Sequence, residues 1–555
     1  MAKRWRLALL LFFSILLLAG LIGLGVISRP FSKVQEVTFE EPGGDVLHAS
    51  YISGTQPLGV IMLEGFGSDQ IALRPATNFF INAGFHVFSF DFSGHGRSSG
   101  GLGFDNAETD RLAQQVLAAK DLFISRSGLT EEQIVYFGHS MGARVALQAA
   151  VLDPSPPTAL ILLGTQLNLG VNLQSSFFTG TDDSTLEWVQ ALSAQVPKSH
   201  ILLLSGGMDD IITPQAAQAL YQKLTSGNQS DNSGYSRQLS IIPGLVHNYE
   251  IYSVRLLQQM VDDLEKLGLV HWDTAISLTH YYIFGVLSLF GFLGMLVIIP
   301  INQKKVKPVT PPDQPSLSIQ HLRKFLKGKL LLWLAAIPVA VILASLFFLL
   351  PLNLPVFNLI YVGFIGGYGI LMVILYLFGK VPGTEGKWKL KNQSDGEKLR
   401  IKGNTFWLGF FLWSSILLIS IIITRSGLYY VIPINQRLVW VVIFSVFTAV
   451  GFWVSAKESS MVMAFLARCT QKRKGADFIL TLIGLVPFFL YTLLMGILGS
   501  ISGMIGGLQG LLILFIVIQT GSILARYIKK AWIIAALQSV LLYLLILPQG
   551  VLFTF

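Results

Sequence analysis

Long apolar runs constrain the fold of this chain more than any other feature of its sequence. About 20 consecutive apolar residues are enough to cross a lipid bilayer as a helix. The 555 residues contain nine such runs, so we expect an integral membrane protein in which the stretch 28–274 stands apart. The expected spans are residues 7–27, 275–300, 330–351, 355–378, 404–424, 438–456, 477–499, 504–525 and 531–549.

The first run, Leu7 to Ile27, follows three basic residues, Lys3, Arg4 and Arg6. A cleaved signal peptide usually has a shorter apolar core of roughly 7–15 residues. We therefore interpret this run as an uncleaved anchor. Whether or not it is cleaved, the segment that follows is expected to be exported.

Charge is divided unevenly along the chain. Residues 28–274 hold 13 Lys/Arg and 25 Asp/Glu, whereas residues 275–555 hold 24 and 6. Residues 1–6 and four of the later loops together carry 25 basic residues, and the opposite short loops carry 2. The positive-inside rule then places the basic loops and the N-terminus in the cytoplasm. The acidic stretch and the C-terminus are expected outside the cytoplasm, and the plasma membrane is the expected membrane. Topology alone explains the basic half, so no nucleic-acid partner is expected.

The expected spans contain almost no ionisable residues, and His280 lies near the end of one of them. Transporters and proton relays usually place charged side chains at membrane depth. We therefore favour a scaffold or anchor over a transporter for this region. The single cysteine, Cys469, excludes an intramolecular disulfide.

Residues 34–268 have the pattern of one α/β domain. Short apolar runs bounded by Gly, Asp or Ser fit buried parallel strands. Helical patterns alternate with these runs, which predicts a doubly wound, mostly parallel sheet. The predicted strands include 60–63, 87–90, 134–137, 160–163, 201–204 and 238–242, and the predicted helices include 106–126, 141–152 and 249–267.

Ser140 lies in residues 138–142, Gly-His-Ser-Met-Gly, between a strand-like run and a helical pattern. A strand, a sharp turn and a helix in this order form a nucleophile elbow, which exposes the serine for attack. A second G-x-S-x-G match, residues 96–100, is followed by no helical pattern. We therefore interpret Ser98 as a loop serine and Ser140 as the candidate nucleophile.

A serine hydroxyl becomes a good nucleophile only when a base takes its proton and a third group orients that base. Asp209, Asp210 and His247 follow Ser140 in the order serine, acid, histidine, each after a strand-like run. The position along the chain does not distinguish the two aspartates. His139 is not expected to be the base, because neighbouring side chains on an elbow diverge.

An acyl-transfer site also needs backbone donors for the developing oxyanion. One expected donor is the N–H of Met141, the residue after the nucleophile. The second is expected from residues 64–68, Glu-Gly-Phe-Gly-Ser, with Phe66 as the first choice and Gly67 as the alternative.

These segments together resemble the α/β-hydrolase superfamily, in particular its serine aminopeptidase S33, lysophospholipase-like and dienelactone-hydrolase-like branches. Residues 91–98, Asp-Phe-Ser-Gly-His-Gly-Arg-Ser, are similar to the D-x-x-G-H-G-x-S segment of the family. Residues 206–214 match its acid-loop pattern, which favours Asp209 over Asp210. The resemblance implies that Ser140 is the nucleophile, Asp209 the acid and His247 the base.

The chain departs from the family at Glu64-Gly65, where many members have His-Gly. A carboxylate there would oppose an oxyanion unless it points away or is paired. The resemblance covers less than half of the chain, and the membrane region resembles no family that we can name.

These features predict a membrane-anchored serine hydrolase that cleaves an ester, thioester or amide through an acyl-enzyme, with no metal or organic cofactor. An esterase or lysophospholipase-like activity is the first hypothesis and a peptidase the second. The segment between Gly164 and His200, with Phe177, Phe178 and Trp188, is short enough for only a small lid or an open site, which suits an ester, lipid or short peptide. The alternatives are a binding or sensing module without catalysis, and a transporter with an attached domain.

Overall fold

The chain folds into two compact units in the computed structural model. We call residues 1–25, 283–494 and 506–548 the helical unit, and residues 26–282, 495–505 and 549–555 the α/β unit. The structure describes residues 2–103, 107–165, 197–226, 234–271, 277–302, 319–381, 405–425, 433, 435–469, 476–528 and 530–554.

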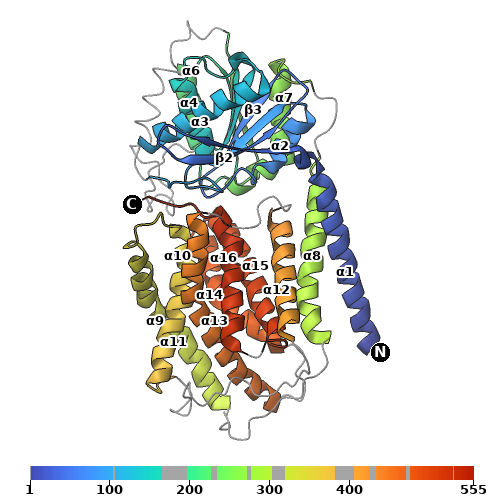
Figure 1. The fold of residues 1–555 in the computed structure, drawn as a ribbon, viewed down its shortest axis with the longest axis vertical. Helices are drawn as coiled ribbons and strands as arrows, with labels where there is room; N and C mark the ends of the chain where they lie inside the picture. The colour runs from blue at the N-terminus through green and yellow to red at the C-terminus, as the bar shows by residue number, and fades with distance from the viewer. Residues whose placement is uncertain are drawn as a thin grey trace. The chain divides into compact units, whose positions relative to one another are not determined.

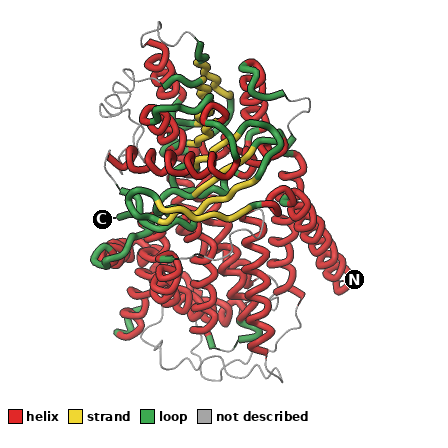
Figure 2. The backbone as a smooth tube through the Cα atoms, turned by 45° about the horizontal axis from the view of Figure 1, so that its top comes forward, coloured by secondary structure: helices red, strands yellow, loops and turns green. Residues whose placement is uncertain are grey.

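An eight-stranded sheet forms the centre of the α/β unit, with the strand order β1-β2-β4-β3-β5-β6-β7-β8 (Figures 1 and 2). The pairs β1–β2 and β2–β4 are antiparallel, and every other pair is parallel. The predicted doubly wound, mostly parallel sheet is therefore confirmed. The strands are β1 Gln35–Glu40, β2 Val46–Ile52, β3 Gly59–Leu63, β4 His86–Phe90, β5 Ile134–His139, β6 Ala159–Leu163, β7 His200–Gly206 and β8 Arg237–Ile242.

Helices cover both faces of this sheet, so the central strands are apolar on both sides. Figure 1 shows α3, α4 and α6 on one side and α2 and α7 on the other. The core on the second side joins α2 and α7 to Val60, Met62, Val135 and Ile161 of the sheet. The helices are α2 Arg74–Asn82, α3 Ala107–Ser127, α4 Met141–Leu152, α6 Pro214–Ser226 and α7 Val254–Lys266.

The parallel strands bring their carboxyl ends to one edge of the sheet. The register pairs Leu63 with Gly138, and Leu163 with both His139 and Leu204. The loops that follow β3, β5 and β7 therefore begin beside one another. These loops contain the predicted oxyanion segment, the elbow and the acid, so the topology itself assembles the candidate site.

Two short segments from far along the chain, residues 495–505 and 549–555, complete the α/β unit. In the second segment, Leu552 donates its N–H to the carbonyl of Gly94 at 2.9 Å, and its own carbonyl accepts the N–H of Leu102 at 2.8 Å. The Phe553 ring lies 5.8 Å from the ring of Phe66. Leu552 and Phe553 are almost fully buried. Segment 550–554 is thus built into the α/β unit, with residues 551–553 buried and one strand-like bridge between Leu102 and Phe553.

The helical unit contains the expected long apolar helices (Figures 1 and 2). Among the described residues, seven helices are long and apolar enough to cross a membrane, while the apolar stretches Thr481–Ile497 and Ala531–Ile546 are shorter. A π-helical turn, Val362–Gly366, interrupts the fourth of the seven. The helices are α1 Ala2–Ile27, α8 Thr279–Asn302, α9 Ile319–Phe347, α10 Leu359–Tyr361, α11 Gly367–Leu377, α12 Thr405–Arg425, α13 Gln436–Cys469, α14 Ala476–Ile497, α15 Ile501–Leu524 and α16 Ala531–Ile546.

Helices α9 and α13 extend beyond the predicted spans. Among the ionisable residues of these extensions are Lys329 in α9 and Glu458 in α13. Both side chains are buried, and they form an ion pair. Each residue lies within two positions of a predicted span end, just outside the stretch that the sequence predicted to be almost free of ionisable residues.

Candidate active site

Ser140 lies at a strained turn between β5 and α4. Its φ of 57° and ψ of −115° are unusual for a residue with a side chain. A Cβ atom at Gly138 would lie 2.5 Å from the carbonyl oxygen of Gly142, and one at Gly142 would lie 2.4 Å from that of Leu63. The turn therefore admits only glycine at these two positions. The predicted strand, turn and helix are all present.

The three residues expected to act together lie in one chain of contacts. His247 Nε2 lies 2.9 Å from Ser140 Oγ, and His247 Nδ1 lies 2.7 Å from Asp209 Oδ2. Because a carboxylate only accepts, Nδ1 carries the proton and Nε2 is left to accept the hydroxyl proton of Ser140. All three side chains are buried. The arrangement can therefore move a proton away from a serine hydroxyl.

The structure separates the roles of the two adjacent aspartates. Asp209 Oδ1 accepts the backbone N–H groups of Ile211 and Ile212 at 2.8 and 2.7 Å, which fixes the carboxylate with Oδ2 toward His247. Asp210 instead accepts hydrogen bonds from the backbone and side chain of Ser502. Asp209 contacts the histidine, while Asp210 holds segment 495–505 within the α/β unit.

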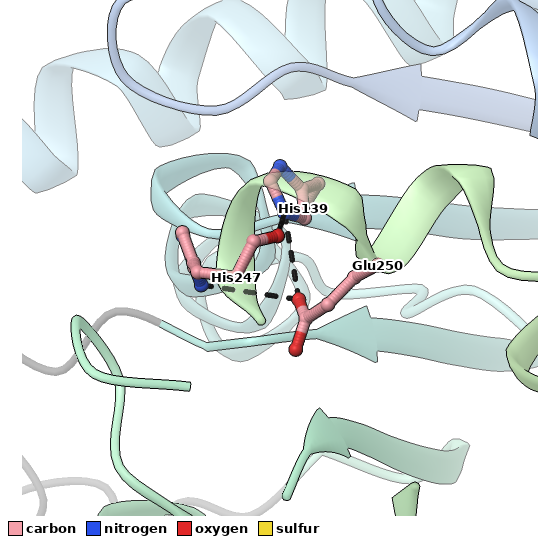
Figure 3. A group of neighbouring side chains, drawn as sticks. All are labelled: His139, His247 and Glu250. Atoms are coloured by element: carbon pink, nitrogen blue, oxygen red, sulfur yellow. Dashed lines mark hydrogen bonds and ion pairs between the residues drawn. The ribbon is translucent and has the colours of Figure 1, made fainter. Parts of the chain in front are cut away.

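A second carboxylate lies beside the histidine, and nothing in the sequence analysis identified it. Glu250 is fully buried, and its Oε2 lies 3.4 Å from His139 Nε2 and 3.9 Å from His247 Nδ1 (Figure 3). Its Oε1 accepts the N–H of Gly206 at 2.7 Å, while Oε2 has no hydrogen-bond partner among the described residues. The only sequence signal was an acidic residue three positions after the candidate base.

Room for Glu250 depends on glycine. A Cβ atom at Gly164 would lie 2.4 Å from Glu250 Oε2 and 2.9 Å from His247 Nδ1. The ring of His139 stacks on that of His247, with centroids 4.9 Å apart (Figure 3). His139 therefore supports the histidine from one side and does not contact Ser140 as a base.

Electrostatics favour a protonated His247 more than is usual. Burial lowers the pKa of the imidazole, but the hydrogen bond and charge of Asp209, together with the charge of Glu250, outweigh burial and raise the pKa above its ordinary value. A higher pKa makes His247 a stronger base once it is deprotonated.

His139, His247 and Glu250 also form a group whose ligand atoms are close enough to hold a metal ion. Metal binding would require a deprotonated Nδ1 on His247, but this atom donates to Asp209. The geometry therefore suits a network around the base better than a metal centre.

The loop after β3 runs beside the serine. A Cβ atom at Gly65 would lie 3.2 Å from Ser140 Cβ, so the loop backbone can approach the nucleophile closely. Glu64 is turned away, because its Oε1 accepts the N–H of Phe92 at 2.7 Å. Burial, reinforced by Asp91, raises the pKa of Glu64 well above its usual range. Because Glu64 is turned away and its burial disfavours the charged form, its carboxyl opposes negative charge at the site less than an exposed carboxylate would.

The predicted loop role of Ser98 agrees with its contacts. Its hydroxyl donates to the carbonyl of Asp91 at 2.5 Å and accepts the N–H of His48 at 2.9 Å. The Asp91 carboxylate accepts the N–H groups of Gln70 and Arg97. Segment 91–98 therefore serves to brace the loops below the site.

The remaining sequence predictions concern the oxyanion donors and the candidate lid. Met141 is fully buried at the start of α4, and Phe66 follows Gly65, which approaches Ser140. That their N–H groups act as oxyanion donors stays a prediction. The candidate lid with Phe177, Phe178 and Trp188 lies outside the described residues.

Comparison with known proteins identifies the α/β unit. Residues 57–189 match the family described as serine aminopeptidase, S33. Together with the eight-stranded sheet, this match shows that the unit has the α/β-hydrolase fold. The helical unit is not recognised by the family comparison.

Several proteins are similar to part of the chain. An uncharacterized protein from Mycobacterium tuberculosis is 24% identical over 201 residues, which are 36% of this chain and 66% of that protein. An alpha/beta hydrolase domain-containing protein from Caenorhabditis elegans is 27% identical over 161 residues, 28% of this chain and 45% of that protein. The chain thus spans about two thirds of the first relative and less than half of the second.

Solved structures similar to this chain include mouse alpha/beta hydrolase domain-containing protein 10 and an esterase from Pyrococcus furiosus. The mouse protein is 19% identical with a TM-score of 0.32, and the match covers 42% of this chain and 99% of that one. The esterase is 18% identical with a TM-score of 0.34, and the match covers 43% and 95%.

Proposed function

We propose that this chain, whose α/β unit has the α/β-hydrolase fold, is a membrane-anchored serine hydrolase that works through an acyl-enzyme. The observation that carries the proposal is the continuous contact from Ser140 Oγ to His247 and on to Asp209, at 2.9 and 2.7 Å. A buried serine at a strained turn has no structural need for such a relay.

The mechanism follows from the placement of each group. His247 Nε2 takes the proton of Ser140 as Oγ attacks the carbonyl carbon of the substrate. The negative charge that forms on the substrate oxygen is stabilised by the N–H of Met141, at the positive end of α4, and by the proposed second donor, the N–H of Phe66. His247 then gives its proton to the leaving group. In the second half of the reaction His247 takes a proton from water as the water attacks the acyl carbon, and it returns that proton to Ser140 Oγ as the acid product leaves.

An ester is the first candidate substrate class, with lipid esters included because the chain is proposed to be anchored in a membrane. Amide hydrolysis is the second candidate, and the matched family description, serine aminopeptidase, favours it. A thioester would follow the same chemistry. A panel of acyl esters and aminoacyl amides given to the same purified protein ranks these classes by kcat/KM.

We further propose that the α/β unit and its catalytic groups lie on the extracytoplasmic face. The alternation of basic and nearly uncharged loops supports this orientation. The attachment of segments 495–505 and 549–555 to the α/β unit supports this orientation too. These segments follow α14 and α16, and neither helix has a basic residue in its last turn.

A fluorophosphonate probe tests the mechanism on the full-length protein in membranes. We expect covalent labelling of the wild type and none of Ser140→Ala or His247→Ala. Ser98→Ala is the matched control, because it alters the other G-x-S-x-G serine and should leave labelling intact. Labelling that persists in Ser140→Ala would reject the proposed nucleophile, and a folded wild type without labelling would favour a binding module.

A further inference from the structure

The helical unit contains a cavity of about 350 Å³, a size typical of small-molecule sites. Helices α9, α11, α13, α14, α15 and α16 supply its walls. Most of the lining is apolar or aromatic, including Phe325, Trp333, Phe364, Phe452, Phe488 and Leu514.

The cavity contains one ion pair. Lys329 of α9 pairs with Glu458 of α13, and both residues line the cavity. Tyr368 donates its hydroxyl proton to Glu458 Oε1 at 2.7 Å. A buried ion pair often costs more in lost hydration than it returns in attraction. Charged residues retained within membrane-type helices therefore point to a function.

The Lys329–Glu458 pair presents hydrogen-bond donors, and not acceptors, to a ligand. Both oxygens of Glu458 are engaged, one by Lys329 and the other by Tyr368. The Lys329 ammonium has three N–H groups, and Glu458 is its one hydrogen-bond partner among the described residues. The other recorded neighbours of the ammonium are the faces of Trp333 and Tyr368, at 5.6 and 4.9 Å. Lys329 therefore retains donors for an anionic ligand group.

Polar and apolar groups are separated along the cavity. Glu458 and Gly451 mark its extent on α13, and Thr481 and Phe488 mark it on α14. Each pair is seven positions apart, or about 10 Å along a helix. The charged pair and Thr481 lie at one end, while Phe488 and Gly451 lie at the other.

The wall is interrupted at the apolar end. The π-helical turn Val362–Gly366 supplies Phe364 and Ile365 to the lining, and Pro487 lies within α14. Such π-turns are frequent at functional sites because they cost hydrogen bonds that a plain helix would keep. At Gly484, an added Cβ would meet only the flexible tip of Ile518, at 3.3 Å, so space remains there.

We propose that this cavity binds a single-chain amphiphile with a carboxylate head, with the head at Lys329 and the chain against Phe364 and Phe488. The charge of Lys329 selects the head, and the length and apolar wall select the chain. This site is independent of Ser140 and would remain if the proposed hydrolase activity were absent.

Photolabelling of the full-length protein in phosphatidylcholine nanodiscs tests this site. The probe is decanoate carrying a diazirine, and labelled peptides are identified by mass spectrometry. We expect labels on peptides that line the cavity, competition by decanoate, and at least tenfold weaker competition by decanol or a decyl trimethylammonium salt. Equal competition by the three amphiphiles would reject selection of a carboxylate.

Variants separate the cavity from nonspecific binding. We expect Lys329→Gln and the space-filling Gly484→Leu to lower cavity labelling at least tenfold. Lys327→Gln, at an exposed lysine of the same helix, and Ser140→Ala should label as the wild type does. Equal losses in Lys327→Gln and Lys329→Gln would overturn the assignment.

A charge-balanced variant covers the case in which Lys329→Gln alone does not fold, since that change leaves Glu458 unpaired. Lys329→Gln combined with Glu458→Gln removes both charges, and its folding is checked by gel filtration and thermal unfolding. A folded double variant with at least tenfold less labelling supports the site. A folded double variant that labels like the wild type overturns it.

Discussion

At the scale of single residues, the hydrogen-bond partners of each carboxylate oxygen decide which aspartate contacts His247. Asp209 has one oxygen engaged by two backbone N–H groups and the other by His247. Asp210, its neighbour in the chain, is engaged by Ser502. Their positions along the chain did not distinguish the two aspartates, but the resemblance of residues 206–214 to the family's acid loop favoured Asp209. The fold gives the two carboxylates different contacts.

Substitution of these two aspartates tests that difference. Asp209→Asn should lower kcat by about 10⁴-fold, because the amide no longer holds the imidazole tautomer that accepts the serine proton. Asp210→Asn is the matched control and should keep kcat within a few-fold, since Asp210 does not contact His247 in the structure. Ester hydrolysis by the purified full-length variants gives both values, and a larger loss in Asp210→Asn would contradict the assignment.

The raised pKa of His247 predicts the pH dependence of the reaction. The base must be neutral, so kcat/KM should rise with pH to a midpoint above about 6.5, the ordinary histidine value. Glu250→Gln removes a nearby negative charge, which lowers the pKa of His247 and should move the midpoint to lower pH. The exposed Glu265→Gln should leave the midpoint unchanged, and an unmoved midpoint in Glu250→Gln would show that Glu250 does not act on the base.

At the scale of elements, the strand-turn-helix around Ser140 was predictable, because glycine spacing and apolar runs are local signals. The segment after His247 was less predictable. Its residue pattern predicted one helix from Tyr249, whereas the structure has a 3₁₀ turn, His247–Tyr252, before α7 begins at Val254. That turn brings Glu250 back toward the histidine. A contact of this kind depends on tertiary packing, and a residue pattern does not record it.

Crowding at the elbow predicts a stability effect at Gly142. In Gly142→Ala, the new methyl group would lie 2.4 Å from the carbonyl oxygen of Leu63, and such overpacking typically costs about 1–3 kcal/mol. The melting temperature of the α/β unit should fall by roughly 2–4 °C per kcal/mol. Gly234→Ala, where an added Cβ meets nothing within 4 Å, is the control. Equal melting temperatures for the two variants would contradict the crowding at the elbow.

At the scale of the whole molecule, the sequence predicted the α/β domain within 34–268 and the later helices, since both depend on local periodicity. It did not predict that residues 495–505 and 549–555 belong to the α/β unit. Nor did it predict the Lys329–Glu458 pair, because pairing across helices becomes visible only when the helices are packed.

The proposed orientation predicts which thiols a membrane-impermeant reagent can reach. In intact cells, the natural Cys469 should stay unlabelled because residues 457–476 are predicted to be cytoplasmic. A cysteine introduced in place of the exposed Arg126 of α3 should be labelled. Permeabilised cells serve as the control, in which both thiols should react, and labelling of Cys469 in intact cells would contradict the orientation.

The contact of Phe553 with Phe66 predicts a link between the last segment and the α/β unit. Phe553→Ala removes a buried ring and should destabilise the α/β unit by about 3–5 kcal/mol. Thr554→Ala, at an exposed neighbour, should have little effect. Hydrogen exchange of residues 94–102 measures the difference, and equal protection in the two variants would show that the ring does not support these loops.

The attachment of segment 550–554 to the α/β unit has a consequence for biosynthesis. Ribosomes release this segment only after α8 to α16 have been made, so Leu102 and Gly94 wait for their hydrogen-bond partners until the helical unit has been synthesised. The α/β unit can therefore reach its final form only after the chain of the helical unit has been made. We expect completion of the candidate site to be coupled in this way to synthesis of the helical unit.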